Sequence, residues 1–184
     1  MRKIERAYGG GQKWLHWTVA LLVIGLVPAG ILMGRLPESP VQDRLYNMHR
    51  SFGMLVLALM LVRIVLRLRA GAAPKALGLT RFEQVASTAT HHILYLLLLA
   101  VPLVGWLAMS AYGGDWSVFG LFQPPRLIGK SEALSERLFG LHFIAALCLG
   151  ALALMHVGAA LKHRFVKKDG VLQRMLPEAK DSTS

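Results

Sequence analysis

Four apolar stretches constrain this chain more than any other feature of its sequence. Each has close to the ~20 residues that an α-helix needs to cross about 30 Å of hydrocarbon. The bilayer core offers no hydrogen-bond partner to exposed backbone groups, so segments of this kind cross it as helices. The sequence predicts an all-α, four-helix transmembrane bundle. The apolar stretches occupy Leu15–Met33, Met48–Leu68, Ile93–Tyr112 and Leu138–Leu161, and the helices are expected at about 15–33, 48–68, 88–112 and 137–162.

Composition agrees with a single membrane domain over residues 1–184. Hydrophobic residues make up 54% of the chain and charged residues 17%, which is too apolar for an ordinary soluble domain of this length. The first segment is basic and then apolar, like a signal peptide, but no clear cleavage site follows it. We expect it to remain as the first helix, and we expect residues 163–184 to form a basic cytoplasmic tail.

Basic residues are unevenly divided between the two sides of the predicted bundle. The side that carries both termini collects most of the 21 Lys and Arg residues, so both termini are predicted to be cytoplasmic. The net charge of +11 then follows from the topology, and we expect no nucleic-acid partner. The opposite side has fewer cations: Arg35, Arg44, Arg126, Lys130 and Arg137, with Arg50 just inside a helix start.

All seven histidines fall inside or at the edges of the predicted helices, where polar groups are costly and usually functional. His142 and His156 are 14 residues apart. That interval is about 21 Å along a helix and returns to within roughly 40° of the same direction. The two side chains therefore share one face at two depths. One metal ion cannot use both ligands, so the spacing favours two separate cofactors.

Facing helices supply a partner at each depth. His16 begins the outward-running first helix and matches the depth of His156, whereas His49 begins the inward-running second helix and matches His142. The sequence predicts two haems with these four histidines as iron ligands. Because Cys148 is the single cysteine, no thioether attachment is expected. A lone histidine is more often an interhelical hydrogen-bonding residue. Other histidines compete for the cytoplasmic haem: His163, His91 and His92.

The interval of 14 residues recurs on the other helices and connects His16 to Gly30, His49 to Arg63 and His91 to Gly105. A glycine at the level of a haem would let the flat macrocycle approach the backbone. Arg63 would lie at the level of the cytoplasmic haem, where its guanidinium needs an anion such as a haem propionate. The alternative is that Arg63 extends to the membrane surface beside its neighbouring arginines.

Several motifs in this order and spacing point to one family. They are Gln12-x-x-x-His16-Trp17, Asn47-Met48-His49, the arginine-bearing run Leu61–Leu68, His142 with His156, and the tail Lys168-Asp169-Gly170-x-Leu172-x-Arg174-Met175-x-Pro177. Over nearly its whole length the chain resembles the bacterial cytochrome b561 family of small di-haem inner-membrane proteins. The resemblance implies two b-type haems with the four ligands named above. It also implies superoxide oxidase activity, in which electrons from periplasmic superoxide reach ubiquinone, although some members have no assigned donor.

Candidate substrate residues follow from this resemblance. Superoxide is an anion, and six outer cations are candidates for steering it, with ordinary loop solvation as the alternative: Arg35, Arg44, Arg50, Arg126, Lys130 and Arg137. Quinone reduction consumes protons, so its site needs polar groups that exchange them. The candidates at the cytoplasmic end are His163, His91 and Lys13. The alternative for His163 is an interfacial histidine solvated by headgroups.

Two other functions compete with the oxidase. The first is a cytochrome b subunit that anchors a hydrogenase or a formate dehydrogenase, although the short loops offer little docking surface for a large partner. The second is a non-haem metal or proton transporter, which the lack of intramembrane carboxylates disfavours.

Overall fold

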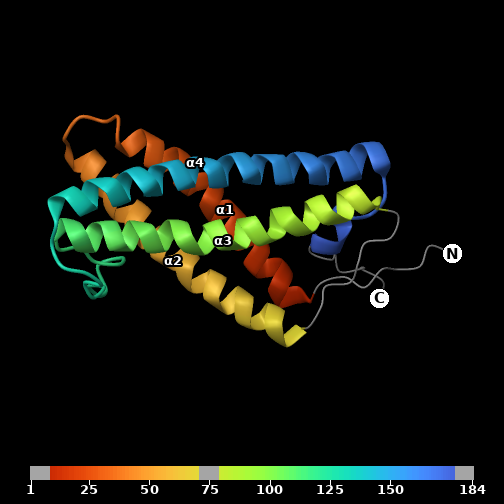
Figure 1. Cartoon of the computed structure of the whole chain (residues 1–184), viewed down its shortest axis with the longest axis horizontal. Helices are drawn as coiled ribbons and strands as arrows, with labels where there is room; N and C mark the ends of the chain where they lie inside the picture. Colours follow the sequence, from red (N-terminus) through yellow and green to blue (C-terminus); the bar gives the residue numbers. More distant parts are fainter. Residues whose placement is uncertain (1–8, 71–78, 177–184) are drawn as a thin grey trace, which may run out of the picture.

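The computed structural model describes residues 9–70 and 79–176, which form four long helices, as expected from the apolar stretches (Figure 1). All four are long and apolar enough to cross a membrane. Residues 71–78 and part of the expected basic tail, 177–184, lie outside the described residues. The helices are α1 Gly10–Met33, α2 Pro40–Ala70, α3 Arg81–Tyr112 and α4 Glu132–Lys162.

All four helices begin before their predicted starts, because polar residues continue each helix beyond the hydrocarbon. Pro40 occupies the first position of α2, where its missing N–H costs nothing. Thr80 caps α3 in a capping box: its hydroxyl accepts from the Glu83 N–H at 3.2 Å, and the Glu83 carboxylate accepts from the Thr80 N–H at 3.1 Å. Ser131 accepts from the Leu134 N–H at the start of α4.

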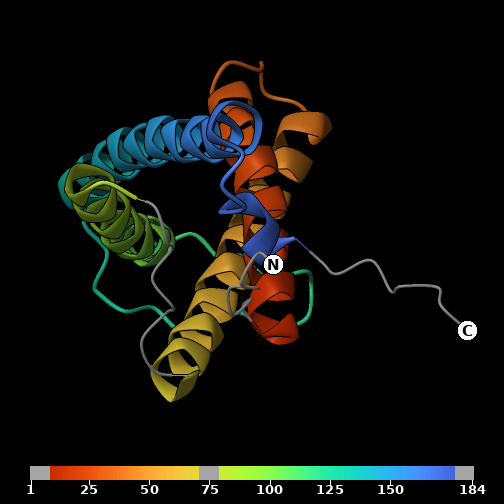
Figure 2. The same cartoon turned by 90° about the vertical axis from the view of Figure 1, so that its right-hand side faces the viewer.

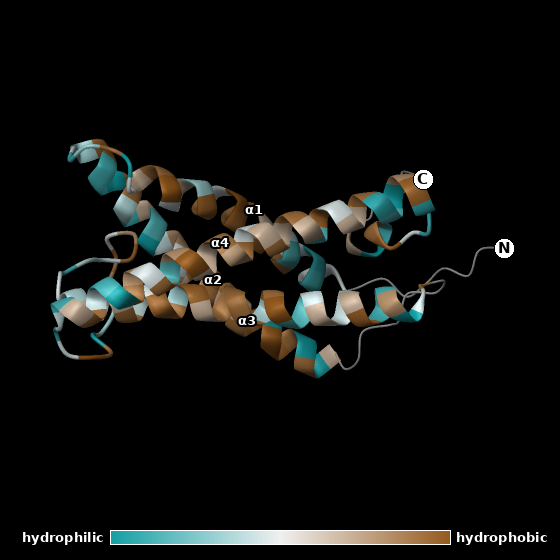
Figure 3. Ribbon diagram, turned by 45° about the horizontal axis from the view of Figure 1, so that its top comes forward, coloured by the Kyte–Doolittle hydropathy of each residue, from teal (hydrophilic) through white to brown (hydrophobic). Residues whose placement is uncertain are grey.

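The helices pack as two pairs. α3 lies along α4 and α1 along α2, with fewer contacts between the pairs, and Figure 2 shows the pairs side by side. Apolar residues predominate in the middle of the helices and hydrophilic residues toward both ends (Figure 3). Many of the apolar side chains face outward, as in Leu21 and Leu154, which are 72% and 75% exposed. Such surfaces require lipid, so the protein is a multi-pass membrane protein.

The start of α1 and the end of α4 lie at the same end of the bundle, here called the terminal end (Figure 1). α4 continues there as a π-helical turn, His163–Lys167, and a 3₁₀ turn, Leu172–Met175, brings the chain back to α1. The Trp17 indole N–H donates to the Met175 carbonyl at 2.8 Å. The α1–α2 loop and the loop 113–131 form the opposite end, where the Phe119 N–H donates to the Ser51 hydroxyl on α2.

Candidate functional site

Four half-buried histidines form two pairs at two levels of the bundle. Near the terminal end, the rings of His16 on α1 and His156 on α4 have centroids 6.3 Å apart. Near the opposite end, the rings of His49 on α2 and His142 on α4 have centroids 6.0 Å apart. The structure thus brings together the same two pairs that helix direction and spacing predict.

The buried core lies between these two levels. On every helix the core residues lie, in the sequence, between the residue at the level of one histidine pair and the residue at the level of the other. A packed apolar layer therefore separates the histidine pairs, so each pair has a site of its own. The core residues are Val19, Val23, Val56, Met60, Val101 and Leu149.

Both pairs have the separation that haem ligation requires. Two imidazoles that bind one transition-metal ion from opposite sides, through nitrogens about 2 Å from it, place their ring centroids about 6 Å apart. A hydrogen bond to α3 orients the His142 ring, because its Nδ1–H donates to the Val101 carbonyl at 2.9 Å. This bond leaves Nε2 of His142 with its lone pair available for iron, the usual arrangement of a histidine ligand.

Two glycines lie directly against the opposite-end pair. A Cβ atom at Gly30 would lie 3.1 Å from Cε1 of His49, and one at Gly105 would lie 3.0 Å from both Cε1 and Nδ1 of His142. Glycine is therefore the residue that lets the α1 and α3 backbones approach these rings. Both glycines lie at the level of a histidine pair, and the group beside each of them is an imidazole ring.

We expect Gly105→Ala to weaken cofactor binding at the opposite-end pair alone. The added methyl group displaces the His142 ring, and overpacking of this kind costs about 1–3 kcal/mol. Haem retained per protein after purification measures the effect. Gly25→Ala is the matched control, because Gly25 is an exposed glycine of α1 where a Cβ meets nothing within 4 Å. An unchanged haem content in Gly105→Ala would show that this close approach does not define the site.

Arg63 is directed into the bundle rather than toward the membrane surface. Its Nε donates to the Tyr95 hydroxyl at 2.9 Å, and its Nη2 donates to Nδ1 of His16 at 3.2 Å. A guanidinium has no acceptor, so Nδ1 of His16 accepts here. If His16 were an iron ligand through Nε2, its Nδ1 would carry the proton, and Arg63 would need another partner in place of this contact. An anionic haem propionate beside His16 fits that requirement.

A third histidine joins the terminal-end pair. The His91 ring lies 5.2 Å from the His156 ring, between centroids, and its Nδ1–H donates to the Ser87 carbonyl at 2.6 Å. The competition between His91 and His16 as partner of His156 therefore persists in the structure. The neighbouring His92 makes the equivalent bond, with its Nδ1–H donating to the Thr88 carbonyl at 2.8 Å, and has no ring contact with His156.

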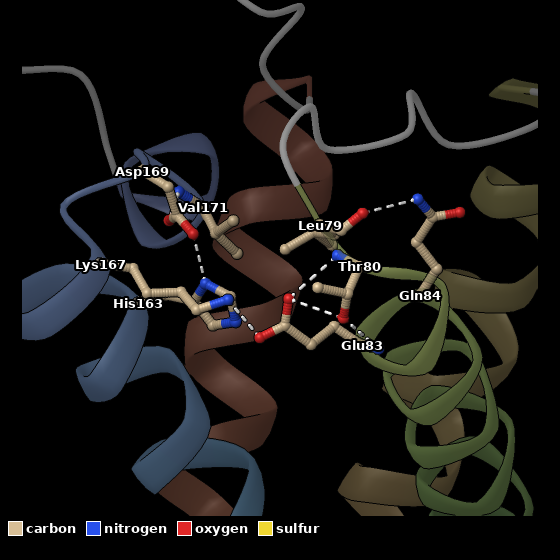
Figure 4. Close-up of polar contacts among 8 residues, drawn as sticks. All are labelled: Leu79, Thr80, Glu83, Gln84, His163, Lys167, Asp169 and Val171. Carbon is tan, nitrogen blue, oxygen red and sulfur yellow. Dashed lines mark hydrogen bonds and ion pairs between the residues drawn. The ribbon is translucent and has the colours of Figure 1, made fainter.

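His163 lies in a more protected environment than its basic neighbours in sequence indicate. Its side chain is only 14% exposed, and its Nδ1 lies 2.5 Å from Oδ2 of Asp169 (Figure 4). Lys167 forms an ion pair with Glu83, and this contact links the π-helical turn to α3. Neither Asp169 nor Glu83 is recognisable as a site residue from the sequence alone, because each meets its partner only through the tertiary fold. Lys13, the other terminal-end candidate, is buried near the start of α1.

The outer cations lie at the opposite end but differ in their partners. Arg126 is paired with Asp115 at 3.1 Å and also donates to the Gly113 carbonyl, so its charge is largely neutralised. Lys130 packs its methylene groups against Gly113. Arg50 follows His49 directly on α2 and lies over the Tyr46 ring, with 5.6 Å between its Cζ and the ring centroid. The remaining three are exposed: Arg35, Arg44 and Arg137.

Comparison with known proteins agrees with this architecture. Residues 7–178 match the family described as prokaryotic cytochrome b561. "Cytochrome b561 homolog 2" of Escherichia coli K12 is 34% identical over 176 residues, covering 92% of this chain and 90% of the relative. "Probable superoxide oxidase CybB" of Yersinia pestis is 31% identical over 175 residues, covering 95% and 98%. "Cytochrome b562" of Cereibacter sphaeroides is 34% identical over 177 residues, covering 94% and 96%.

Family membership implies b-type haem, which removes the ground for a non-haem transporter. With four membrane-spanning helices and histidines paired at two levels, this chain belongs to the prokaryotic cytochrome b561 family of membrane electron-transfer proteins.

Proposed function

We propose that this protein is a superoxide:ubiquinone oxidoreductase that carries electrons across the bacterial inner membrane. The observation that carries the proposal is that two histidines of α4, at two levels of the bundle, each face a histidine of another helix. In the proposal His16 and His156 hold one haem b, and His49 and His142 hold the other. Haem with two histidine ligands supplies one-electron transfer and has no open position for oxygen.

The residues around each pair have distinct tasks in this proposal. Gly30 and Gly105 leave room for the rings of His49 and His142 beside the α1 and α3 backbones. Arg63, which lies beside His16, would hold a haem propionate at the terminal end through its guanidinium. The core layer between the levels keeps water out of the path between the two sites.

The overall reaction balances without a further oxidant. Two superoxide anions lose one electron each and leave as O₂. The two electrons and two protons convert one ubiquinone to ubiquinol. By the distribution of basic residues, superoxide is oxidised at the opposite, periplasmic end, and the terminal end is cytoplasmic. The relative named as a probable superoxide oxidase supports this donor.

Arg50 is the leading cation for attracting superoxide. It is next to His49 in sequence and lies over the Tyr46 ring, whereas Arg126 forms a salt bridge with Asp115. A cation beside a partly desolvated site raises the local concentration of an anionic substrate. Arg35, Arg44, Lys130 and Arg137 contribute to the field at longer range.

The quinone site is proposed at the terminal end, around His163. The Asp169 carboxylate accepts from Nδ1–H of His163, which leaves Nε2 to interact with a quinone carbonyl. The His163–Asp169 couple then delivers protons from the cytoplasmic side as the quinone gains electrons. His91 and Lys13 are further candidates for this site because they lie on α3 and α1 near the same end.

Anaerobic mixing of the oxidised holoprotein with superoxide tests the proposal. We expect rapid appearance of the reduced b-type spectrum, followed by formation of ubiquinol when ubiquinone is present. A haem spectrum that stays oxidised would exclude superoxide as the donor. A metalloenzyme recovered with the protein from native membranes in equal amount would favour the anchor-subunit alternative.

The same measurement tests the role of Arg50. We expect Arg50→Gln to slow haem reduction by superoxide about three- to tenfold and to weaken its dependence on ionic strength. Arg126→Gln is the matched control, because it removes an arginine at the same end whose charge Asp115 already balances. Equal slowing in both variants would assign the effect to the general charge of the surface.

A further inference from the structure

A groove at the end of α4 has no role in the proposed electron path. It has a volume of about 470 Å³ and lies where the π-helical turn meets the returning chain. Its lining combines two cations, one aromatic ring, one glycine and one amide: Arg164, Lys168, Phe165, Gly170 and Gln173. No carboxylate is among these lining residues.

The backbone around the groove is held in shape by specific contacts. Lys168 adopts the left-handed conformation, with φ 52°, and its N–H donates to the His163 carbonyl. Gly170, with φ 82°, completes the reversal that brings Gln173 toward Arg164. Asp169 accepts from the Val171 N–H at 3.2 Å, which stabilises the same turn.

The cations have few competing anions. The Gln173 amide satisfies both of its neighbours when its nitrogen donates to the Gly170 carbonyl at 3.1 Å and its oxygen accepts from the Arg164 guanidinium. This contact orients Arg164 without neutralising it. The nearest acid in sequence, Asp169, is paired with His163. The groove therefore presents a positive charge next to an aromatic surface.

The depth of the groove in the membrane follows from its exposed apolar residues. Phe165 and Val166 are 68% and 73% exposed, and they continue a helix long and apolar enough to span the bilayer. Burying these side chains in lipid places the flanking cations, Arg164 and Lys168, at the level of the headgroups. A guanidinium and an ammonium at that level are suited to the phosphate of a phospholipid.

We propose that this groove is a binding site for the phosphate headgroup of an anionic phospholipid. In the bound state Arg164 and Lys168 contact the phosphate, and Phe165 lies beside the upper acyl chain. None of the lining residues is among those proposed to bind haem, superoxide or quinone, and the groove lies in the same turn as His163 and Asp169.

Lipid retention by the holoprotein tests this site. The protein is placed in nanodiscs of phosphatidylcholine with increasing phosphatidylglycerol, and bound lipid is counted by native mass spectrometry after release. Loss of both charges in Arg164→Gln/Lys168→Gln is expected to weaken phosphatidylglycerol binding about thirtyfold, and Lys168→Gln alone about fivefold. The haem spectrum of each variant shows whether it has folded, and the single variant serves where the double one does not fold.

Two controls make the result specific. Arg69→Gln/Arg81→Gln removes two exposed arginines from the same end, outside the groove, and is expected to retain wild-type binding. If this variant loses as much lipid as the groove variant, the general surface charge binds the lipid and the proposal is wrong. Inorganic phosphate at millimolar concentration is expected not to displace the lipid. Displacement would show a site for free anions instead.

Discussion

His49→Ala and His142→Ala are each expected to halve the haem content of the purified protein, and His16→Ala and His156→Ala to halve it by losing the other haem. In the proposed assignment each pair supplies both ligands of one iron, so removing either histidine would leave that iron with a single protein ligand. The core layer between the levels keeps the remaining site intact. The haem content per protein measures how much haem each variant loses. A redox titration of each variant then shows which of the two proposed haems is missing.

The other histidines serve as controls for this assignment. His92→Ala is expected to keep both haems, because the ring contact with His156 is made by His91 and not by His92. His91→Ala is the more demanding comparison, since His91 lies 5.2 Å from His156 between ring centroids. Loss of a haem in His91→Ala with retention in His16→Ala would assign His91 as the ligand.

His163→Ala is expected to slow ubiquinone reduction about 10²- to 10⁴-fold, the range that a positioned proton donor contributes. Reduction of the haems by superoxide should continue at the wild-type rate, because the opposite end is unchanged. The variant therefore accumulates reduced haem, which separates a quinone-site defect from loss of folding. Stopped-flow spectra record haem reduction, and ubiquinol formation is followed in the same reaction.

Asp169→Asn probes the partner of His163. We expect a smaller loss of ubiquinone reduction, partly restored in Asp169→Glu, because the carboxylate orients His163 instead of contacting quinone. Asp115→Asn is the matched control, since Asp115 is an ion-paired carboxylate at the opposite end. If His163→Ala removes a haem while His156→Ala retains both, then His163 is an iron ligand and the quinone assignment is wrong.

Much of the architecture is predictable from local periodicity. The number of helices follows from stretches long enough to span hydrocarbon, and the cap at Thr80 follows from the residue types at the start of α3. The shared face of His142 and His156 follows from 3.6 residues per turn. Matching depths for His16 and His49 require only that successive helices run in opposite directions.

Other features of the sites depend on contacts between residues far apart in the sequence. The sequence left two positions open for Arg63, at a haem or at the surface, and Tyr95 and His16 hold it inward. Nothing local places His91 beside His156, because their meeting depends on how α3 and α4 are rotated against each other. The burial of His163 likewise depends on the reversal after α4 that brings Asp169 back to it.

The sequence by itself thus determined the four spans, the two depths and the histidines that mark them, because helix length and helical repeat are local properties. Only the tertiary structure decided which side chains meet at each depth: Arg63 with His16, Gly105 with His142, and Lys167 with Glu83. The physical reason is that rotation of each helix about its axis is set by packing against its neighbours. A rotation error of one residue turns a side chain by about 100°, from the bundle interior toward lipid.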